Sequence, residues 1–273
     1  MKVLIIGSTG MLGSMCYDYL HSRNIKVIGY SRTSSPRSQI TGDVFELNWE
    51  ELILYHNVTA VVNCIGMLNN ALDQSFKEFL LINTTLPNMF MSIAKRTSVH
   101  FIHVSTDCVF SGKKGPYSIN DKADALDKYG LSKSFGEAII DGSNTTVIRT
   151  SIIGPEIQRS KNSGLLHWAI SQRDNRIEGY SEVFWNGVTT LELSKVIERI
   201  FLKGFTGMTQ VACDRCISKL ELLTIINKIF GLGLIIKSSS RQVSNKCLIN
   251  SGEFLVADIT TQIKNLYDFE RQF

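Results

Sequence analysis

Residues 3–13 of the chain read V-L-I-I-G-S-T-G-M-L-G, and this stretch decides the fold. Its apolar start predicts a strand buried on both faces, and residues 14–23 continue with helical spacing. A strand, a glycine turn and a helix open a βαβ unit, whose turn binds the pyrophosphate of a dinucleotide at the helix N-terminus. A plain tight turn is the alternative. The expected cofactor contacts of this turn are Gly7, Thr9, Gly10, Met11, Leu12 and Gly13.

The composition is that of a globular protein with a sizeable core: 273 residues, 44% hydrophobic and 20% charged. The net charge of +4 forms no run of Lys or Arg, so we expect no nucleic-acid partner. No window is long and apolar enough to span a membrane, and we expect no membrane partner.

The six cysteines are scattered and do not form a disulfide framework, which indicates a reducing compartment. We therefore expect a cytoplasmic protein. Cys213-x-x-Cys216 is a single pair with no second pair and no nearby histidine, so we predict no metal site.

The end of the second predicted strand, residues 24–30, bears on the choice of cofactor. NAD enzymes place an acid there, whereas this chain has Ser31 and Arg32, which suit the 2′-phosphate of NADP. We expect NADP(H), with NAD(H) as the alternative if Arg32 is only a solvated loop residue. Asp43, at the end of a short third strand, is a candidate contact for the adenine, or simply begins a turn.

Two further segments point to the cofactor edge of the sheet. Residues 59–65 predict a buried strand, and ligands bind at the carboxyl ends of parallel strands, which places Asn63, Cys64 and Gly66 at the cofactor. Asn83 lies inside a long helical stretch, residues 71–96, where asparagine is mildly unfavourable. It is either functional or caps a kink.

A strand at residues 99–104 runs directly into Ser105 and Thr106, whose hydroxyls could hold a carbonyl oxygen as it gains negative charge. Downstream, Tyr129 and Lys133 are four residues apart and share one face of a helix. A neighbouring ammonium would lower the pKa of the phenol toward the working range. Taken alone, such a pair arises on many surface helices by chance.

The three motifs in combination resemble the extended short-chain dehydrogenase/reductases. The resemblance is closer to the dTDP-4-dehydrorhamnose reductase group, through residues 105–112, the segment from Tyr129 to Lys133, and Gly136-Glu137 behind it. Cys108 departs from the Tyr that this group commonly has, and it also differs from the Glu with which the dTDP-glucose 4,6-dehydratases eliminate water.

The resemblance implies NADPH-dependent reduction of the 4-keto group of a nucleotide-activated 6-deoxyhexose, for the synthesis of cell-surface polysaccharide sugars. It gives Tyr129 the role of proton donor and Thr106, with Ser105, the carbonyl oxygen. Lys133 lowers the pKa of Tyr129 and holds the nicotinamide ribose, and Asn83 completes a water relay behind Lys133. The expected substrate contacts are Asp107, Cys108, Val109, Phe110 and Trp185. Related reductases are often homodimers.

Two alternatives stay open at this point. The first is a nucleotide-sugar epimerase/reductase in which Cys108 acts as base or acid, because the GDP-fucose synthases resemble this chain more distantly and pair a Cys there with a His. His167 lies in roughly the matching region. The second is a non-catalytic NADP-binding regulator that kept the fold.

The pattern and the resemblance together predict an α/β fold, a doubly wound, mostly parallel sheet of the Rossmann type over residues 1–150. A smaller substrate lobe, residues 151–273, is expected to return one or two elements to the main sheet. There we predict helices at 165–172 and 191–202 and a strand at 207–212. Ser218-x-x-Glu221 predicts a capping box that opens a helix to about Phe230. Residues 176–185 are expected to be irregular, and 235–273 a mixed tail.

Overall fold

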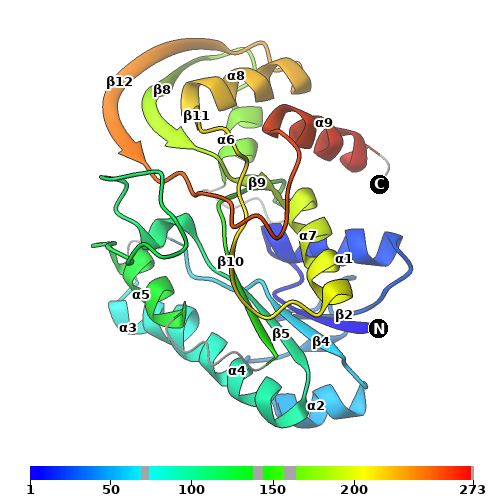
Figure 1. Ribbon diagram of the computed structural model, residues 1–273. Coiled ribbons are helices and arrows are strands. Elements are labelled where there is room, and N and C mark those ends of the chain that lie inside the picture. Colours follow the sequence, from blue (N-terminus) through cyan, green and yellow to red (C-terminus); the bar gives the residue numbers. More distant parts are fainter. Residues whose placement is uncertain (69–73, 138–143, 157–163, 272–273) are drawn as a thin grey trace.

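The computed structural model describes residues 1–68, 74–137, 144–156 and 164–271. They form a larger α/β part around one parallel sheet and a smaller lobe from the C-terminal part of the chain (Figure 1). The main sheet has seven strands in the order β10-β6-β5-β4-β1-β2-β3, and every neighbouring pair is parallel. Its strands are β1 (Lys2–Ile6), β2 (Lys26–Ser31), β3 (Ile40–Thr41), β4 (Ala60–Asn63), β5 (His100–Val104), β6 (Thr145–Arg149) and β10 (Gly207–Gln210). The predicted doubly wound parallel sheet is confirmed.

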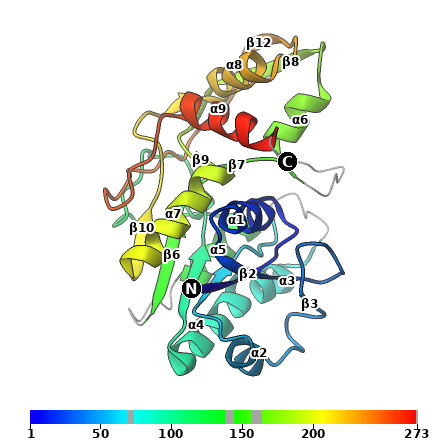
Figure 2. The ribbon, with the colours of Figure 1, turned by 90° about the vertical axis from the view of Figure 1, so that its right-hand side faces the viewer.

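The side chains of β1 alternate between two cores, because successive residues of a strand point to opposite faces. Val3 and Ile5 pack in the cluster beneath α1 (Met11–Ser22) and α7 (Thr190–Lys203). Leu4 and Ile6 pack in the cluster beneath α2 (Trp49–Tyr55) and α4 (Leu86–Thr97). Helices therefore cover both faces of the sheet (Figure 2). The strand order reverses at β1, which lies between β2 and β4, so the glycine turn stands at the topological switch point.

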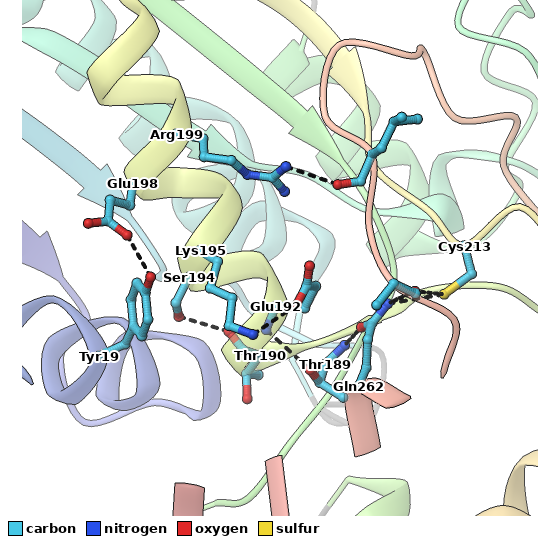
Figure 3. Close-up of polar contacts among 12 residues, drawn as sticks. Tyr19, Thr189, Thr190, Glu192, Ser194, Lys195, Glu198, Arg199, Cys213 and Gln262 are labelled. Carbon is cyan, nitrogen blue, oxygen red and sulfur yellow. Dashed lines mark hydrogen bonds and ion pairs between the residues drawn. The ribbon is translucent and has the colours of Figure 1, made fainter. Parts of the chain in front are cut away.

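Polar contacts tie α7 to its neighbours (Figure 3). The Tyr19 hydroxyl of α1 donates to the Glu198 carboxylate at 2.5 Å. Burial and this carboxylate raise the pKa of the Tyr19 phenol. At the start of α7, the Thr189 side chain accepts from the Glu192 N–H, while the Thr189 N–H donates to Gln262 of α9 (Ile259–Glu270) at 2.8 Å. Helix α7 thus links the main sheet to the lobe.

The long helix expected over residues 71–96 is divided. It forms α3 (Phe76–Leu80), a π-helical turn (Leu81–Thr85) and α4, and Asn83 within the turn bonds Met67 and Ser132 through its amide. Residues 71–73 of that prediction lie outside the described residues. Helix α5 spans Lys128–Glu137.

The lobe is built on a three-stranded sheet in the order β11-β8-β12. Its elements are α6 (Leu165–Ser171), β8 (Arg176–Trp185), β11 (Ile217–Ser218), α8 (Lys219–Phe230) and β12 (Ile235–Asn245). The predicted helices here are confirmed. The expectation of irregular structure at 176–185 is wrong: this segment is β8, held by parallel pairing with β12, a partner distant in sequence. The mixed tail likewise contains β12 and α9.

Two local features of the lobe differ from expectation. Ser218 accepts from the Glu221 N–H at 3.1 Å, but the Glu221 carboxylate pairs with Arg215 and does not complete the capping box. Cys216 forms a disulfide with Cys247, although scattered cysteines indicated a compartment in which disulfides are rare. The bond joins the start of β11 to the segment that follows β12.

Beyond residue 150 the chain returns to the main sheet as β10, which pairs with β6, and as α7, which packs on α1. A short pair, β7 (Ile152–Ile153) and β9 (Val188–Thr189), lies between the two parts. The division at residue 150 itself stays a prediction. In the described part of the chain, no helix combines the length and apolar character needed to cross a membrane.

Candidate active site

The glycine turn has the geometry of a phosphate-binding loop. Gly7 has φ +90°, a conformation that favours glycine. A Cβ at Gly13 would lie 2.0 Å from the Gly7 carbonyl oxygen, so helix α1 can pack against the turn only because residue 13 has no side chain. A Cβ at Gly10 would make only ordinary contact, 3.5 Å from the same oxygen. Helix α1 has no side-chain cap, which leaves its first N–H groups for a ligand. This combination fits a dinucleotide pyrophosphate.

The other members of the turn contribute through different parts. Leu12 is buried in the core, so it can offer a ligand only its backbone, whereas Thr9 and Met11 are partly exposed. Ser8 donates to the Tyr30 carbonyl and lies 3.0 Å from the hydroxyl of Ser38. The turn is therefore fixed against the end of β2.

The candidates for the adenosine end of the cofactor lie around the end of β2. Arg32 is exposed, whereas Arg37 forms a bidentate ion pair with Asp18 at 2.7 and 2.8 Å. Ser31 is buried and donates to the Thr33 carbonyl. The Asp43 carboxylate accepts from the Phe45 N–H at 2.8 Å, which is the turn geometry that was the alternative to adenine binding.

Two asparagines expected at the cofactor, Asn63 at the end of β4 and Asn83 in the π-helical turn, have partners within the protein. Asn63 is buried and turns its amide into the protein, toward His103 and the Ile65 N–H. Asn83 bonds both the N–H and the carbonyl of Met67, at 2.9 and 3.0 Å, and the Ser132 hydroxyl. Its amide groups fix the chain after β4 to α5. Cys64 and Gly66 stand at the same sheet edge, and a Cβ at Gly66 would meet the Asn83 side chain.

The hydroxyls of Thr106 and Tyr129 lie near each other where β5 ends beside α5, and the Thr106 hydroxyl donates to the Asp107 carboxylate at 3.1 Å. Thr106 also caps the turn Asp107–Val109 by accepting from the Cys108 N–H at 3.1 Å. The Ser105 hydroxyl is buried and has no hydrogen-bond partner within the described structure. Helix α5 approaches this turn so closely that a Cβ at Gly130 would lie 2.2 Å from the Cys108 carbonyl oxygen. Glycine at this position therefore allows the approach that brings Tyr129 to the end of β5.

The pKa of Tyr129 is raised in this structure, whereas we expected a net lowering. Burial raises the pKa of the phenol, and Cys108 and Asp107 add to that effect, while the nearby Thr106 hydroxyl acts in the opposite direction. Removing water disfavours the charged phenolate more than the surrounding groups favour it. Tyr129 is therefore protonated at neutral pH, the state that a proton donor requires.

Lys133 is buried beneath Tyr129 on the same helix. Its Nζ donates to the Val104 carbonyl at 2.8 Å and lies 3.3 Å from Nε2 of His103. Burial lowers the pKa of this ammonium to about 8, against the opposing charges of Glu137 and Cys64. His103 was missed by the sequence analysis, because a single histidine in an apolar strand carries no pattern that distinguishes it from a core residue.

Two expected substrate contacts belong to the core. Val109 and Phe110 are fully buried in a cluster with Tyr117, Ala212 and Leu248, and the rings of Phe110 and Tyr117 stack at 4.2 Å. The 3-10 turn after Thr106 directs these two side chains inward. They support the site from below and offer no surface to a ligand.

A cavity of about 580 Å³ opens beside this site, between the end of β5 and the lobe. Three of the expected substrate contacts, Asp107, Cys108 and Trp185, line it, together with Lys219 and Lys246, which the sequence analysis did not single out. The Lys219 ammonium lies over the Trp185 ring, 4.8 Å from its centre, and the Trp185 indole N–H donates to Ser151 at 2.8 Å. Among the described residues that line the cavity, Asp107 is the sole acid, so the cavity suits an anionic ligand.

The electrostatics of this cavity depend on burial. Burial raises the pKa of the Asp107 carboxyl, although Lys246 and Lys219 act against that shift. Burial also raises the pKa of the Cys108 thiol to about 12, and it lowers the pKa of Lys219 to about 8. His167 lies on α6 and is not among the described residues that line the cavity, so Cys108 has no histidine partner there.

A glycine turn at the switch point of a parallel sheet, with a tyrosine and lysine on one helix facing a strand-end threonine, defines the class of short-chain dehydrogenase/reductases. Within that class, the chain belongs to the RmlD substrate binding domain family, whose model matches residues 1–177.

Several curated proteins are similar to this chain. Agl14 of Haloferax volcanii, a probable low-salt glycan biosynthesis reductase, is 24% identical over 180 residues, which cover 63% of this chain and 60% of that protein. Methionine adenosyltransferase 2 subunit beta of Xenopus laevis is 25% identical over 60% of this chain and 50% of that protein. The matches thus span only about half to three fifths of these two relatives. SpsK of Bacillus subtilis, a spore coat polysaccharide biosynthesis protein, is 26% identical over 90% of this chain and 85% of that protein.

Solved structures share the whole fold. A dTDP-4-dehydrorhamnose reductase from Bacillus anthracis, determined in complex with NADP, superimposes with a TM-score of 0.84. The alignment covers 98% of this chain and 99% of that one at 13% sequence identity. At this identity the likeness establishes the fold.

Proposed function

We propose that this protein uses NADPH to reduce the 4-keto group of a nucleotide-activated 6-deoxyhexose, as a step in polysaccharide sugar synthesis. The observation that carries the proposal is the grouping of Thr106, Tyr129 and the buried Lys133 where β5 ends beside α5, next to a cavity whose lining includes Lys219 and Lys246. The NADP in the related reductase and the names of the curated relatives support the same reaction class.

The residues present fit a nicotinamide cofactor. The uncapped start of α1 and the room at Gly10 suit a pyrophosphate, and the exposed Arg32 suits a 2′-phosphate. The unpartnered Ser105 hydroxyl lies next to Thr106 and suits an oxygen of the substrate or cofactor. When bound, NADPH supplies the hydride. NAD(H) remains the alternative cofactor, because solved neighbours include complexes with NAD.

The protein's own groups supply the proton and stabilise the developing charge. The keto oxygen binds between the hydroxyls of Thr106 and Tyr129, and Tyr129 donates its proton to that oxygen as the carbon accepts hydride. Lys133, in its charged form, stabilises the phenolate that results and holds the nicotinamide ribose. Lys219 and Lys246 attract the anionic substrate into the cavity, and Trp185 offers an apolar wall.

The test is direct. Purified protein is incubated with NADPH and dTDP-4-keto-6-deoxyglucose, with and without a 3,5-epimerase, while absorbance at the nicotinamide band is followed. Sugar-dependent NADPH oxidation in either arm supports the proposal. A wild-type protein that binds NADPH but oxidises none with dTDP- or UDP-linked 4-keto sugars would instead favour a non-catalytic regulator.

We further propose a homodimer that acts in the cytoplasm, as the resemblance to the reductases implies. Light scattering of the purified protein tests the first part, because a single species at the monomer mass of 30.6 kDa would exclude a stable dimer. Fractionation of cells that produce the protein tests the second part.

A further inference from the structure

A chain of buried hydrogen bonds leads from the end of β4 to the catalytic lysine. It joins Asn63, His103 of β5 and Lys133 of α5, and all three side chains are almost completely buried. Such a chain has a direction, because each of its atoms is either a donor or an acceptor. That direction determines which form of Lys133 it favours.

The first link fixes the Asn63 amide. Its Oδ1 accepts from the Ile65 N–H at 3.1 Å, so its Nδ2 faces Nδ1 of His103, also at 3.1 Å. An amide nitrogen only donates, and Nδ1 of His103 therefore accepts. Turning the amide over would set its NH₂ group against the Ile65 N–H.

The second link fixes the histidine. Burial and the charge of Lys133 lower the pKa of His103 well below its ordinary value, so its ring is neutral. A neutral imidazole with an accepting Nδ1 carries its hydrogen on Nε2. That N–H points at Nζ of Lys133, 3.3 Å away. An ammonium has only N–H groups to offer, whereas the free amine has a lone pair that accepts.

We propose that His103 is a positioning residue that acts through Lys133: Asn63 holds it in the Nε2–H tautomer, and this N–H favours the uncharged amine of Lys133. The proposal rests on the proposed function, in which Lys133 works beside Tyr129. His103 thereby lowers the pH above which Lys133 loses its charge. Its ring lies next to the Lys133 ammonium.

Other groups around Lys133 set the sign of the expected change. Glu137 of α5 and Cys64 after β4 favour the charged lysine, and the Val104 carbonyl accepts from either form. Burial and the His103 N–H oppose the charge. Removing the imidazole while keeping the site buried therefore raises the pH at which Lys133 is deprotonated.

The variant His103→Phe removes the N–H and keeps a flat ring beside Phe101, with which His103 stacks. We expect the alkaline limb of kcat, and the ¹³Cε shift titration of Lys133 in labelled protein, to move upward by about 0.5–1 pH unit, the equivalent of one hydrogen bond. His103→Gln, which returns an N–H donor, should bring the titration part of the way back to the wild-type value. The matched control is His100→Phe on the same strand, because His100 faces Thr146 and not Lys133.

Nitrogen-15 spectra of wild-type protein report the tautomer without any assay of activity. We expect the His103 ring to show a protonated Nε2 and a bare Nδ1. A protonated Nδ1, or a Lys133 titration that does not move in His103→Phe, would overturn the proposal. If the proposed reduction were absent while the tautomer and the Lys133 titration behaved as expected, only the assigned reaction would be wrong.

Discussion

The ion pair of Arg149 and Glu137 gives a sharp test of how the site is supported. Three hydrogen bonds of 2.8–3.1 Å join the guanidinium and the carboxylate, and the two side chains are 8% and 3% exposed. Arg149 also donates to the Ile119 carbonyl and lies over the Phe110 ring, 5.3 Å from its centre. Removing one partner of a pair this well buried leaves the other charge buried without a partner, which typically lowers the free energy of unfolding by about 3–5 kcal/mol. We expect Glu137→Gln to cost about 3 kcal/mol, because the amide oxygen still accepts one bond.

Urea unfolding followed by circular dichroism measures this loss, and with a slope of about 2–3 kcal/mol per molar the midpoint should fall by about 1 M. The matched control is Glu50→Gln, which breaks the exposed Arg96 pair, whose side chains are 56% and 40% exposed, and should change stability by less than about 1 kcal/mol. The double variant Glu137→Met with Arg149→Met should recover most of the loss, since no charge is then left without a partner. Equal, small effects of Glu137→Gln and Glu50→Gln would refute the reasoning.

Four further predictions concern the reaction. Tyr129→Phe should keep NADPH affinity and lower kcat by about 10²–10⁴-fold, and unchanged turnover would remove Tyr129 from the mechanism. Arg32→Ala should weaken NADPH binding by about 1–3 kcal/mol and spare NADH, whereas equal losses would show that Arg32 does not read the 2′-phosphate. Burial lowers the pKa of Lys219 to about 8, so its charged form is lost above that pH. KM for the nucleotide sugar should therefore rise above pH 8 in wild-type protein but not in Lys219→Met, and parallel pH profiles would exclude Lys219 from substrate binding. Cys108→Ser should keep most 4-keto reduction, since the raised pKa of the thiol disfavours a thiolate base; deuterium from D₂O at C3 or C5 that depends on Cys108 would instead establish an epimerase.

The sequence predicted the parts of this molecule that depend on neighbours in the chain. The apolar run before Gly7 and the glycines that follow give β1 and the start of α1, because a buried strand and a close helix each need particular residue types at fixed spacing. The pairing of Tyr129 with Lys133 was also predicted from local spacing, since four residues along a helix return to one face, and Thr106 was predicted from its place at the end of a strand. Ser218 marked the start of α8 through a local hydrogen bond.

Tertiary structure decided what depends on neighbours in space. Strand β8 is held by β12, which lies more than fifty residues away in the sequence, and no local pattern predicts that pairing. Lys219 and Lys246 line the cavity from separate segments of the chain. Cys216 and Cys247, 31 residues apart in the sequence, form a disulfide in the C-terminal lobe. Burial also reversed the expected pKa shift of Tyr129, because the loss of water around a phenol depends on everything packed around it. The sequence by itself thus determined the fold class and predicted the candidate catalytic residues, while packing determined their protonation and the shape and charge of the cavity beside them.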